Sequence, residues 1–384
     1  MIQVQDKREC CGCTACASIC NHEAIHMQVD EMGFKYPVVD ISKCVECGLC
    51  EKVCAFQEHY DTASNFQEPF VYAVRHKNNK EIKTSRSGAM FTALSDFIFE
   101  RKGIVYGVGF ADHFRVVHKR ITNREDCKDL KGSKYVQSDL TDIFRSVKKD
   151  LADGFPVLFS GTPCQTSGLH SFLGKKEWEN LYLCDIVCHG VPSPKVWADY
   201  LEYVETKENR LIEKVNFRDK ERGWKAHFES FVFQGGKKII TRTFTDLFYK
   251  HLILRPSCSS CKFTNTRRPS DITIADFWGW EKAVPGFNDD DLGCSLVFVN
   301  TPKGDQLFKH ILPEIHAIQT DLAHCMQPNL EHPSVFSPKY DSFWKDYQRK
   351  GFDFVVKKYG DKGFRHKISQ FKSKVKRIIK YCIK

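Results

Sequence analysis

Eight cysteines near the N-terminus follow one spacing twice. The repeated pattern is C-x2-C-x2-C-x3-C, and its members are Cys10, Cys13, Cys16 and Cys20, then Cys44, Cys47, Cys50 and Cys54. Three thiolates on a tight loop reach three irons of one 4Fe-4S cubane, while a fourth, one helical turn further on, points at the neighbouring cubane. The spacing therefore predicts two 4Fe-4S clusters, with Cys54 completing the first and Cys20 completing the second.

The segment between the two cysteine runs has the pattern of a short hairpin. Apolar residues alternate over 24–29 and 34–39 on either side of a turn at Gly33, as in two antiparallel strands. The whole unit, residues 1–60, resembles the bacterial two-cluster ferredoxin domain, although Asn21 and Ala55 stand where that family usually has proline. Zinc favours separated C-x2-C pairs and disulfides need an oxidising compartment, so neither explains the repeated run.

The remaining residues are far more than such a domain needs. The chain has 384 residues, 42% of them hydrophobic and 13% aromatic, which is enough to bury the core of one or two further domains. Its 18 cysteines, together with the lack of a signal region or of an apolar run near the ~20 residues that span a bilayer, predict a reducing cytoplasm.

The net charge of +10 comes almost entirely from the end of the chain. Nine basic residues and no acidic residue lie within 362–384, at the end of a C-terminal extension over 331–384. This tail is amphipathic at helical spacing, which leaves two interpretations: a solvated terminal helix, or a peripheral contact with an anionic inner membrane face. It has no stacking platform or base-reading motif, so we expect no nucleic-acid partner.

A small-residue turn follows a polar linker over 61–69 and a strand over 71–74. The turn contains Ser85, Ser87 and Gly88 and opens onto a helix expected over 90–101. The N-terminus of a helix offers free N–H groups and partial positive charge, which suit the pyrophosphate or ring edge of a flavin or nucleotide. A helix cap is the structural alternative for Ser87.

Further along, a glycine-serine loop contains Lys134, which could hold a phosphate or could simply be exposed. Strands are expected on one side of this loop, over 104–110 and 115–118, and a helix on the other side, over 138–153.

Two apolar strands over 156–161 and 181–187 flank a helix expected over 165–173. If the strands are parallel neighbours, their carboxyl ends share the sheet edge at which open α/β folds bind ligands. Cysteines follow both strands, and a later C-x2-C pair could join them, so four thiols would make a third iron-sulfur cluster or a zinc site. These cysteines are Cys164, Cys188, Cys258 and Cys261.

The motifs around these cysteines resemble those of the coenzyme F420 hydrogenase/dehydrogenase beta-subunit family. The matching stretches are Gly161-Thr162-Pro163-Cys164-Gln165, Cys188-His189-Gly190-Val191-Pro192-Ser193-Pro194, and Cys258-x2-Cys261 followed by Arg268-Pro269-x-Asp271 and Asp276-Phe277-Trp278-Gly279. The resemblance includes the turn at Ser85 and the loop at Lys134. That family's turn normally reads Ser-x-Ser-Gly-Gly, and this chain has Ala89 in place of the second glycine.

The resemblance implies an iron-sulfur flavoprotein, in which FAD passes electrons between a hydride donor or acceptor and a chain of 4Fe-4S clusters. It assigns Cys164, Cys188, Cys258 and Cys261 to a third 4Fe-4S cluster beside the flavin. It assigns the flavin contacts to Ser85, Ser87, Gly88 and Lys134.

The predicted fold is α+β, with an N-terminal bacterial-ferredoxin-like domain followed by an α/β flavin- and iron-sulfur-binding domain in two parts, 70–150 and 151–330. The predicted activity is that of an oxidoreductase. Its partners would be a small-molecule hydride donor or acceptor, deazaflavin-type or other, and a redox partner protein or ferredoxin. No catalytic side chain is needed beyond a candidate proton relay at His189.

Two other functions fit parts of the sequence. The chain could be an electron-transfer adaptor that docks a partner enzyme and has no substrate pocket of its own. Alternatively, Cys164 could be a nucleophile with His189 as its base, which leaves Cys258 and Cys261 without a role.

Overall fold

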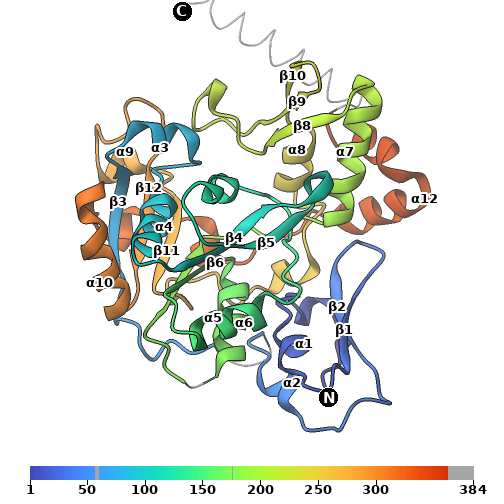
Figure 1. Ribbon diagram of the computed structural model, residues 1–384. Helices are drawn as coiled ribbons and strands as arrows, with labels where there is room; N and C mark the ends of the chain where they lie inside the picture. The colour runs from blue at the N-terminus through green and yellow to red at the C-terminus, as the bar shows by residue number, and fades with distance from the viewer. Residues whose placement is uncertain (57–59, 175, 362–384) are drawn as a thin grey trace, which may run out of the picture.

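A computed structural model of the chain describes residues 1–56, 60–174 and 176–361. It begins with a small module that contains a hairpin (Figure 1). The elements of this module are η1 (Lys7–Glu9), α1 (Ala15–Ile19), β1 (Ile25–Val29), β2 (Lys35–Val39) and α2 (Leu49–Lys52). The strands β1 and β2 are antiparallel, with Ile25 opposite Val39, so the predicted hairpin is confirmed. The basic tail, 362–384, lies outside the described residues.

A mixed sheet forms the centre of the large domain (Figure 1). Within the described residues it has eight strands in the order β13-β3-β12-β11-β7-β6-β4-β5. Strands β4, β6, β7 and β11 are parallel, and the others pair antiparallel. The bounds are β3 (Phe70–His76), β4 (Ile104–Phe110), β5 (Val116–Ile121), β6 (Val157–Gly161), β7 (Leu181–Ile186), β11 (Ile272–Asp276), β12 (Ser295–Val299) and β13 (Ile315–Thr320).

Helices cover both faces of this sheet because its strands are apolar on both sides. Successive strand residues point to opposite faces. Tyr106 and Phe159 accordingly pack with α5 and α6, while Val105 and Leu158 pack with α4 and α10. The helices are α4 (Met90–Glu100), α5 (Ile143–Ala152), α6 (Pro163–Leu173) and α10 (Pro302–Ile311).

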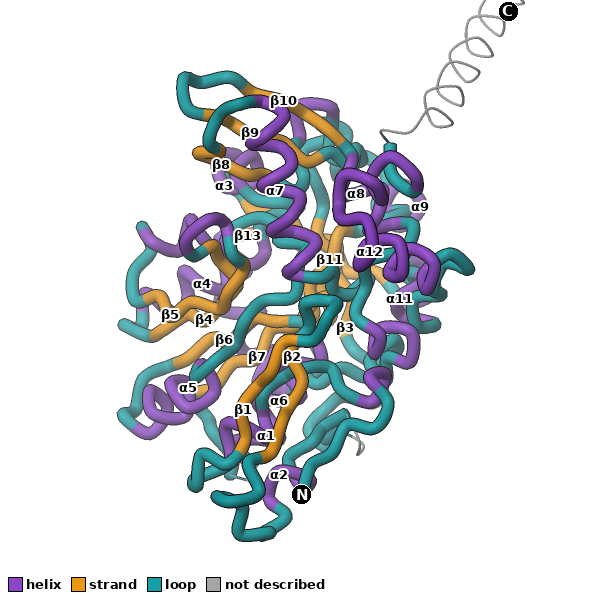
Figure 2. Tube along the Cα trace, turned by 90° about the vertical axis from the view of Figure 1, so that its right-hand side faces the viewer, coloured by secondary structure: helices purple, strands orange, loops and turns teal. Residues whose placement is uncertain are grey.

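The N-terminal module packs against the large domain, and its hairpin and α1 lie next to α6 in Figure 2. The tip of its hairpin abuts α7 (Pro194–Glu208), where a Cβ on Gly33 would lie 2.4 Å from Cβ of Lys195. Helix α1 packs on α6, and a Cβ on Gly168 would lie 2.8 Å from Sγ of Cys13. Only glycine permits these approaches, so the docking is built into the sequence of both units.

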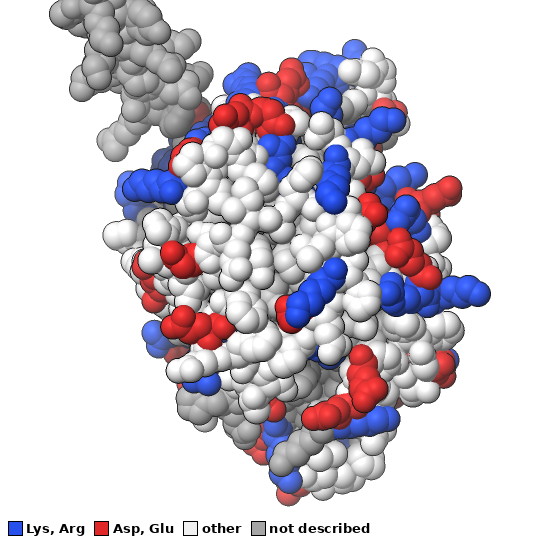
Figure 3. All heavy atoms as spheres, turned by 90° about the vertical axis from the view of Figure 1, so that its left-hand side faces the viewer, with Lys and Arg blue, Asp and Glu red and all other residues white. Residues whose placement is uncertain are grey.

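Acidic and basic side chains are interspersed on the face that carries α10, the left-hand side of Figure 1 (Figure 3). One pair is Lys309 and Asp305, whose Nζ and Oδ2 atoms are 2.6 Å apart. None of the described helices combines the length and the apolar content that a membrane crossing needs.

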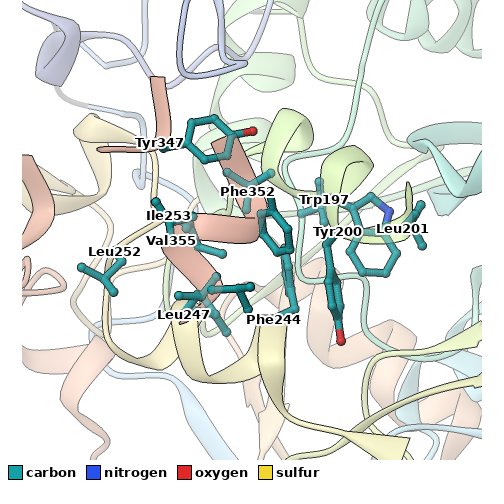
Figure 4. Packing of buried hydrophobic residues seen from close by; sticks show 14 of the residues in the cluster. Trp197, Tyr200, Leu201, Phe244, Leu247, Leu252, Ile253, Tyr347, Phe352 and Val355 are labelled. Atoms are coloured by element: carbon teal, nitrogen blue, oxygen red, sulfur yellow. The ribbon is translucent and has the colours of Figure 1, made fainter. Parts of the chain in front are cut away.

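A second, smaller antiparallel sheet has the order β10-β9-β8 and packs beside α7 over an aromatic core. Trp197 and Tyr200 of α7 meet Phe244 and Phe352 there (Figure 4), and the rings of Tyr200 and Phe244 stack with centroids 5.8 Å apart. The elements of this region are β8 (Ile212–Asn216), β9 (Glu229–Phe233), β10 (Lys238–Thr241), α8 (Thr243–Tyr249) and α12 (Tyr340–Lys358). Three short helices lie elsewhere in the fold: α3 (Asn79–Thr84), α9 (Trp280–Ala283) and α11 (Pro328–Glu331).

The helix predicted over 138–153 begins later than expected, at Ile143. Oδ1 of Asp139 accepts hydrogen bonds from the backbone N–H and the hydroxyl of Thr141. The hydroxyl of Ser138 bonds to Nδ1 of His118 at 2.9 Å. The backbone of Asp139 also pairs with β5, because its N–H donates to the carbonyl oxygen of Val116 at 3.0 Å and its carbonyl oxygen accepts from the N–H of His118 at 2.9 Å. These bonds compete with helical hydrogen bonding, so the helix begins only after them.

A buried ion pair ties the loop that follows Cys261 to β7. Nη2 of Arg268 lies 3.1 Å from Oδ2 of Asp185, and their side chains are 1% and 0% exposed. The same guanidinium donates to the carbonyl oxygens of Phe263 and Ile186 at 2.6 and 2.9 Å. Burial raises the pKa of Asp185, and Arg268 opposes that rise.

We predict that Arg268→Ala lowers the free energy of unfolding by about 3–5 kcal/mol, because it leaves the carboxylate of Asp185 buried without its partner. Urea unfolding of both proteins measures the difference. The matched control is Arg267→Ala, which removes an exposed neighbouring arginine and should change stability by less than about 0.5 kcal/mol. Equal losses in the two variants would contradict the assignment.

Candidate functional site

The structure brings three cysteines of the first run together with the last cysteine of the second. Burial and the neighbouring thiols of Cys13, Cys10 and Cys54 raise the pKa of Cys16 well above its ordinary value. Cys16 lies on α1 and Cys54 follows α2, and these two helices pack together. The four thiols, called here the first thiol set, are therefore grouped as the spacing predicts.

The other four cysteines of the repeated pattern line one small cavity. They are Cys20, Cys44, Cys47 and Cys50, called here the second thiol set. The backbone N–H of Ile2 donates to Sγ of Cys50 at 3.3 Å, whereas Cys47 is exposed. This set therefore stands near the protein surface.

The strand-helix-strand unit β6–α6–β7 carries the next two cysteines to one sheet edge. Strands β6 and β7 are parallel, and Gly161 lies opposite Asp185, which confirms the predicted arrangement. Cys164 stands in the first turn of α6 and Cys188 follows β7. Both therefore lie at the carboxyl edge of the sheet.

The C-x2-C pair approaches the same edge from another part of the chain. Cys258 lies in η5 (Pro256–Ser260) and Cys261 follows it. Burial, and then the thiols of Cys258, Cys164 and Cys261, raise the pKa of Cys188. Cys164, Cys188, Cys258 and Cys261 are called here the third thiol set.

The third thiol set has the chemistry of a metal-cluster site. Burial is the main cause that raises the pKa of Cys258 to about 12 and that of Cys261 to about 11, so the positive charge of bound metal is needed to hold them as thiolates. The backbone N–H groups of Val191 and Gly190 donate to Sγ of Cys258 and Sγ of Cys188, both at 3.4 Å. Hydrogen bonds of this kind stabilise thiolate ligands and tune cluster potentials.

Among residues 1–56, 60–174 and 176–361, no three cysteine, histidine or acidic side chains are grouped closely enough to hold a metal ion. Four thiols at one sheet edge could bind a 4Fe-4S cubane, whose thiolates ligate four separate irons, or a tetrahedral zinc ion.

A cavity of about 450 Å³ opens beside the third thiol set, within the size range of small-molecule sites. It runs along the carboxyl ends of β6, β7 and β11, the usual ligand position in open α/β sheets. Its lining includes Ser85, Ser87, Lys134, Cys188 and His189. Four predicted site residues from distant segments thus share a cavity with one predicted cluster ligand.

Two arginines that line this cavity, the buried Arg218 and the largely buried Arg86, escaped the sequence analysis. Arg86 and Arg218 flank one carboxylate, with Oδ2 of Asp276 at 3.4 Å from Nε of Arg86 and 3.6 Å from Nη1 of Arg218. Nε and Nη1 of Arg86 and Nε of Arg218 are buried without a hydrogen-bond partner among the described residues. Two guanidinium groups against one carboxylate leave a positive charge in the cavity, which suits an anionic group.

Comparison with known proteins agrees with this geometry. Residues 156–321 match the family described as the C terminus of the coenzyme F420 hydrogenase/dehydrogenase beta subunit. The large domain therefore contains a region of this family's type over residues 156–321. Residues 9–57 match the 4Fe-4S dicluster domain, and the two matches together indicate an iron-sulfur oxidoreductase with an electron-transfer domain near its N-terminus.

Two further comparisons add little to the family match. The search of curated proteins gives no match. A solved structure, described as a xenon derivatization of the F420-reducing NiFe hydrogenase complex from Methanosarcina barkeri, is similar at 16% identity, covering 80% of this chain and 98% of that chain with a TM-score of 0.45.

In the turn that follows Ser85, Gly88 serves packing, whereas Ala89 lies on the cavity wall. Gly88 does not line the cavity: a Cβ there would lie 2.1 Å from the carbonyl oxygen of Val74, and its N–H donates to the hydroxyl of Ser295 at 2.9 Å. Ala89 does line the cavity and has φ of 64° at the start of α4. The left-handed conformation explains why the family normally has glycine at this position.

Lys134 uses its ammonium group within its own loop. Nζ donates to the carbonyl oxygens of Asp129 and Lys131 at 2.9 and 2.8 Å. Burial lowers the pKa of Lys134 to about 7. A phosphate contact of Lys134 therefore stays a prediction. The N–H groups of Arg86 that lack a hydrogen-bond partner among the described residues are better placed to hold an anion.

His189 is held by two partners on the wall of the cavity. Its Nδ1 lies 2.9 Å from Oδ1 of Asn329, and its Nε2 lies 2.7 Å from Nε2 of His251. The thiol of Cys164 contacts instead the hydroxyl of Thr162, at 3.2 Å. The geometry thus gives no support to a nucleophilic Cys164 with His189 as its base.

We predict that Ala89→Gly raises the free energy of unfolding, by less than about 1 kcal/mol, because relief of the left-handed strain outweighs the added chain entropy. Chemical denaturation of the purified protein measures the change. Ala93→Gly is the matched control in the interior of α4, and it should lower stability by about 1 kcal/mol or more. If both variants lose stability alike, the backbone of Ala89 is not strained.

Proposed function

We propose that the chain is a flavoprotein that exchanges electrons between a hydride-carrying small molecule and three 4Fe-4S clusters. The observation that carries the proposal is the position of Cys188, which belongs to the third thiol set and also lines the cavity. A flavin held in the cavity would lie directly beside the third cluster. An adaptor without a pocket would have no use for this arrangement.

The residues of the cavity fit FAD. FAD would accept a hydride or two electrons and release electrons one at a time, as the clusters require. Helix α4 begins at the cavity with no side-chain cap, so its N–H groups and positive end can face a pyrophosphate. The buried N–H groups of Arg86 and Arg218 add donors for the same anion, while Trp278 and Tyr249 line an aromatic wall that excludes water.

The remaining thiol sets extend this route towards the surface. The first set adjoins the third, since the thiol of Cys11 hydrogen-bonds to those of Cys13 and Cys164. The second set lies at the far side of the module, where Ile41, Val45 and Leu49 are exposed around it. An apolar surface beside an exposed cluster suits the docking of a redox partner protein or ferredoxin.

The cellular setting follows from the cofactors. Twelve thiolate ligands require reducing conditions, which supports a cytoplasmic location, with the basic segment 362–384 as the part that would contact an inner membrane face. The hydride partner would be a deazaflavin-type or other small molecule that enters the same cavity.

We predict that the protein, purified anaerobically, contains about twelve irons and one FAD per chain. Cys258→Ser should lose about four irons, because it removes a ligand of the third cluster only. Iron, acid-labile sulfide and flavin are quantified together. Cys184→Ser is the matched control, since Cys184 is buried on the opposite face of the sheet and should keep the full iron content. Eight irons with bound zinc and no flavin would contradict the proposal.

We predict that Arg86→Met weakens FAD binding by about 10- to 100-fold, because a charged hydrogen bond contributes about 1.5–3 kcal/mol. Fluorescence titration of the flavin-depleted protein measures the dissociation constant. Arg222→Met, which removes an exposed arginine outside the cavity, should bind FAD as the parent does. Unchanged affinity in Arg86→Met would exclude the arginine from the flavin site.

A further inference from the structure

A buried arginine stands at the boundary between the N-terminal module and the large domain. Arg255 is 0% exposed. Its Nε donates to the carbonyl oxygen of Cys10 at 2.8 Å, and its Nη2 donates to that of Lys35 at 3.0 Å. Nη1 donates to Oε1 of Gln137 at 2.9 Å, from the large domain. The guanidinium is therefore held rigidly from both sides of the boundary.

Arg255 also lies between the first and third thiol sets. Its Nη2 is 3.7 Å from Sγ of Cys10, and its carbonyl oxygen accepts a hydrogen bond from the backbone N–H of Cys258 at 2.9 Å. Burial opposes the charge on Arg255, while interactions with Cys10, Tyr36, Cys11 and Cys258 raise its pKa above the ordinary value. One residue thus contacts a ligand of each set.

No acidic side chain among the described residues forms an ion pair with Arg255. The guanidinium group packs instead against two aromatic rings: its carbon lies 4.3 Å from the ring centroid of Tyr36 and 5.4 Å from that of Phe34. A buried charge without a counter-charge is costly. Ligated iron-sulfur clusters supply negative charge at the thiolates, so clusters on either side would be the missing counter-charge.

We propose that Arg255 is a shared electrostatic control of the first and third clusters, which raises the reduction potentials of both above that of the second cluster. Reduction adds a negative charge to a cluster, and a nearby fixed positive charge stabilises the reduced form. Arginine keeps its charge at every physiological pH, so the effect is constant. The inference rests on the proposed function, because it requires a cluster on the third thiol set.

Raised reduction potentials would retain an electron on the first and third clusters, which are called here the junction clusters. An electron that leaves the cavity would stay on these two clusters, next to Arg255. It would leave when the second cluster passes it to a partner at the surface. The proximity of the two sets supports fast exchange between them, since the thiol of Cys11 contacts both Cys13 and Cys164.

Redox titration of the holoprotein, followed by electron paramagnetic resonance, tests this inference with three variants. Arg255→Gln removes the charge. Gln137→Glu leaves Arg255 in place and neutralises it through the existing contact of Nη1 with residue 137. Each of these two variants should lower the one-electron reduction constants of the junction clusters at least tenfold, which corresponds to about 59 mV. The potential of the second cluster should change less. Arg255→Lys keeps the charge and should shift the potentials less than Arg255→Gln.

The matched control is Arg145→Gln. Arg145 is an exposed residue that also ties the module to the large domain, with Nε donating to the carbonyl oxygen of Ser18 at 2.9 Å and Nη2 to that of Cys20 at 3.0 Å. It should leave the potentials of the junction clusters unchanged. Unaltered potentials in Arg255→Gln and Gln137→Glu, with full iron content, would overturn the inference, as would an equal shift in Arg145→Gln.

Iron content separates this outcome from failure of the proposed function. A parent protein with about eight irons would lack the third cluster, and the proposed function would then fail together with the claim of shared control. A parent with about twelve irons and unshifted potentials would retain the proposed function and reject only the role of Arg255.

Discussion

Parallel pairing of β6 with β7 is the constraint on which the site depends. The pairing sets the carboxyl ends of both strands at one sheet edge, with Gly161 opposite Asp185. Cys164 and Cys188 then stand together, and the cavity opens beside them. Because a one-residue slip would turn every side chain of β7 to the other face, the apolar contacts that fix the register of the sheet also fix the thiol geometry.

Docking of the N-terminal module adds a second requirement, since electrons must cross between two separately packed units. The boundary is closed by positions that admit no side chain, Gly33 against Lys195 and Gly168 against Cys13. Such contacts hold the first thiol set at a fixed place against the third. A module on a flexible linker would instead vary this distance from moment to moment. The rigid contact therefore serves electron transfer as much as stability.

Short-range patterns in the sequence predicted much of this arrangement. The repeated cysteine spacing predicted the grouping of Cys54 with the first run, and alternating apolar residues predicted the β1–β2 hairpin. The strand-helix-strand unit that ends at Cys188 was also predicted, because a buried parallel strand is a continuous apolar run. Each of these features depends on a pattern within a few dozen consecutive residues.

Features built from distant residues could not be predicted in the same way. Arg86, Arg218 and Asp276 meet only after three segments fold together, and an arginine in a loop carries no local sign that it will be buried. Arg255 was missed for the same reason. The start of α5 was predicted too early because the side chain of Ser138 and the backbone of Asp139 form hydrogen bonds to β5 in place of helical ones.

The family motifs themselves mix two kinds of residue, and only the structure separates them. Gly88 serves packing, because the carbonyl oxygen of Val74 leaves no room for a side chain. Arg268 neutralises Asp185 and holds the loop after Cys261 against β7, so its effect on the third thiol set is indirect. Ala89, by contrast, lies on the cavity wall in a conformation suited to glycine. Outside the thiol sets, a motif residue therefore belongs to the cavity only when its side chain or backbone reaches it.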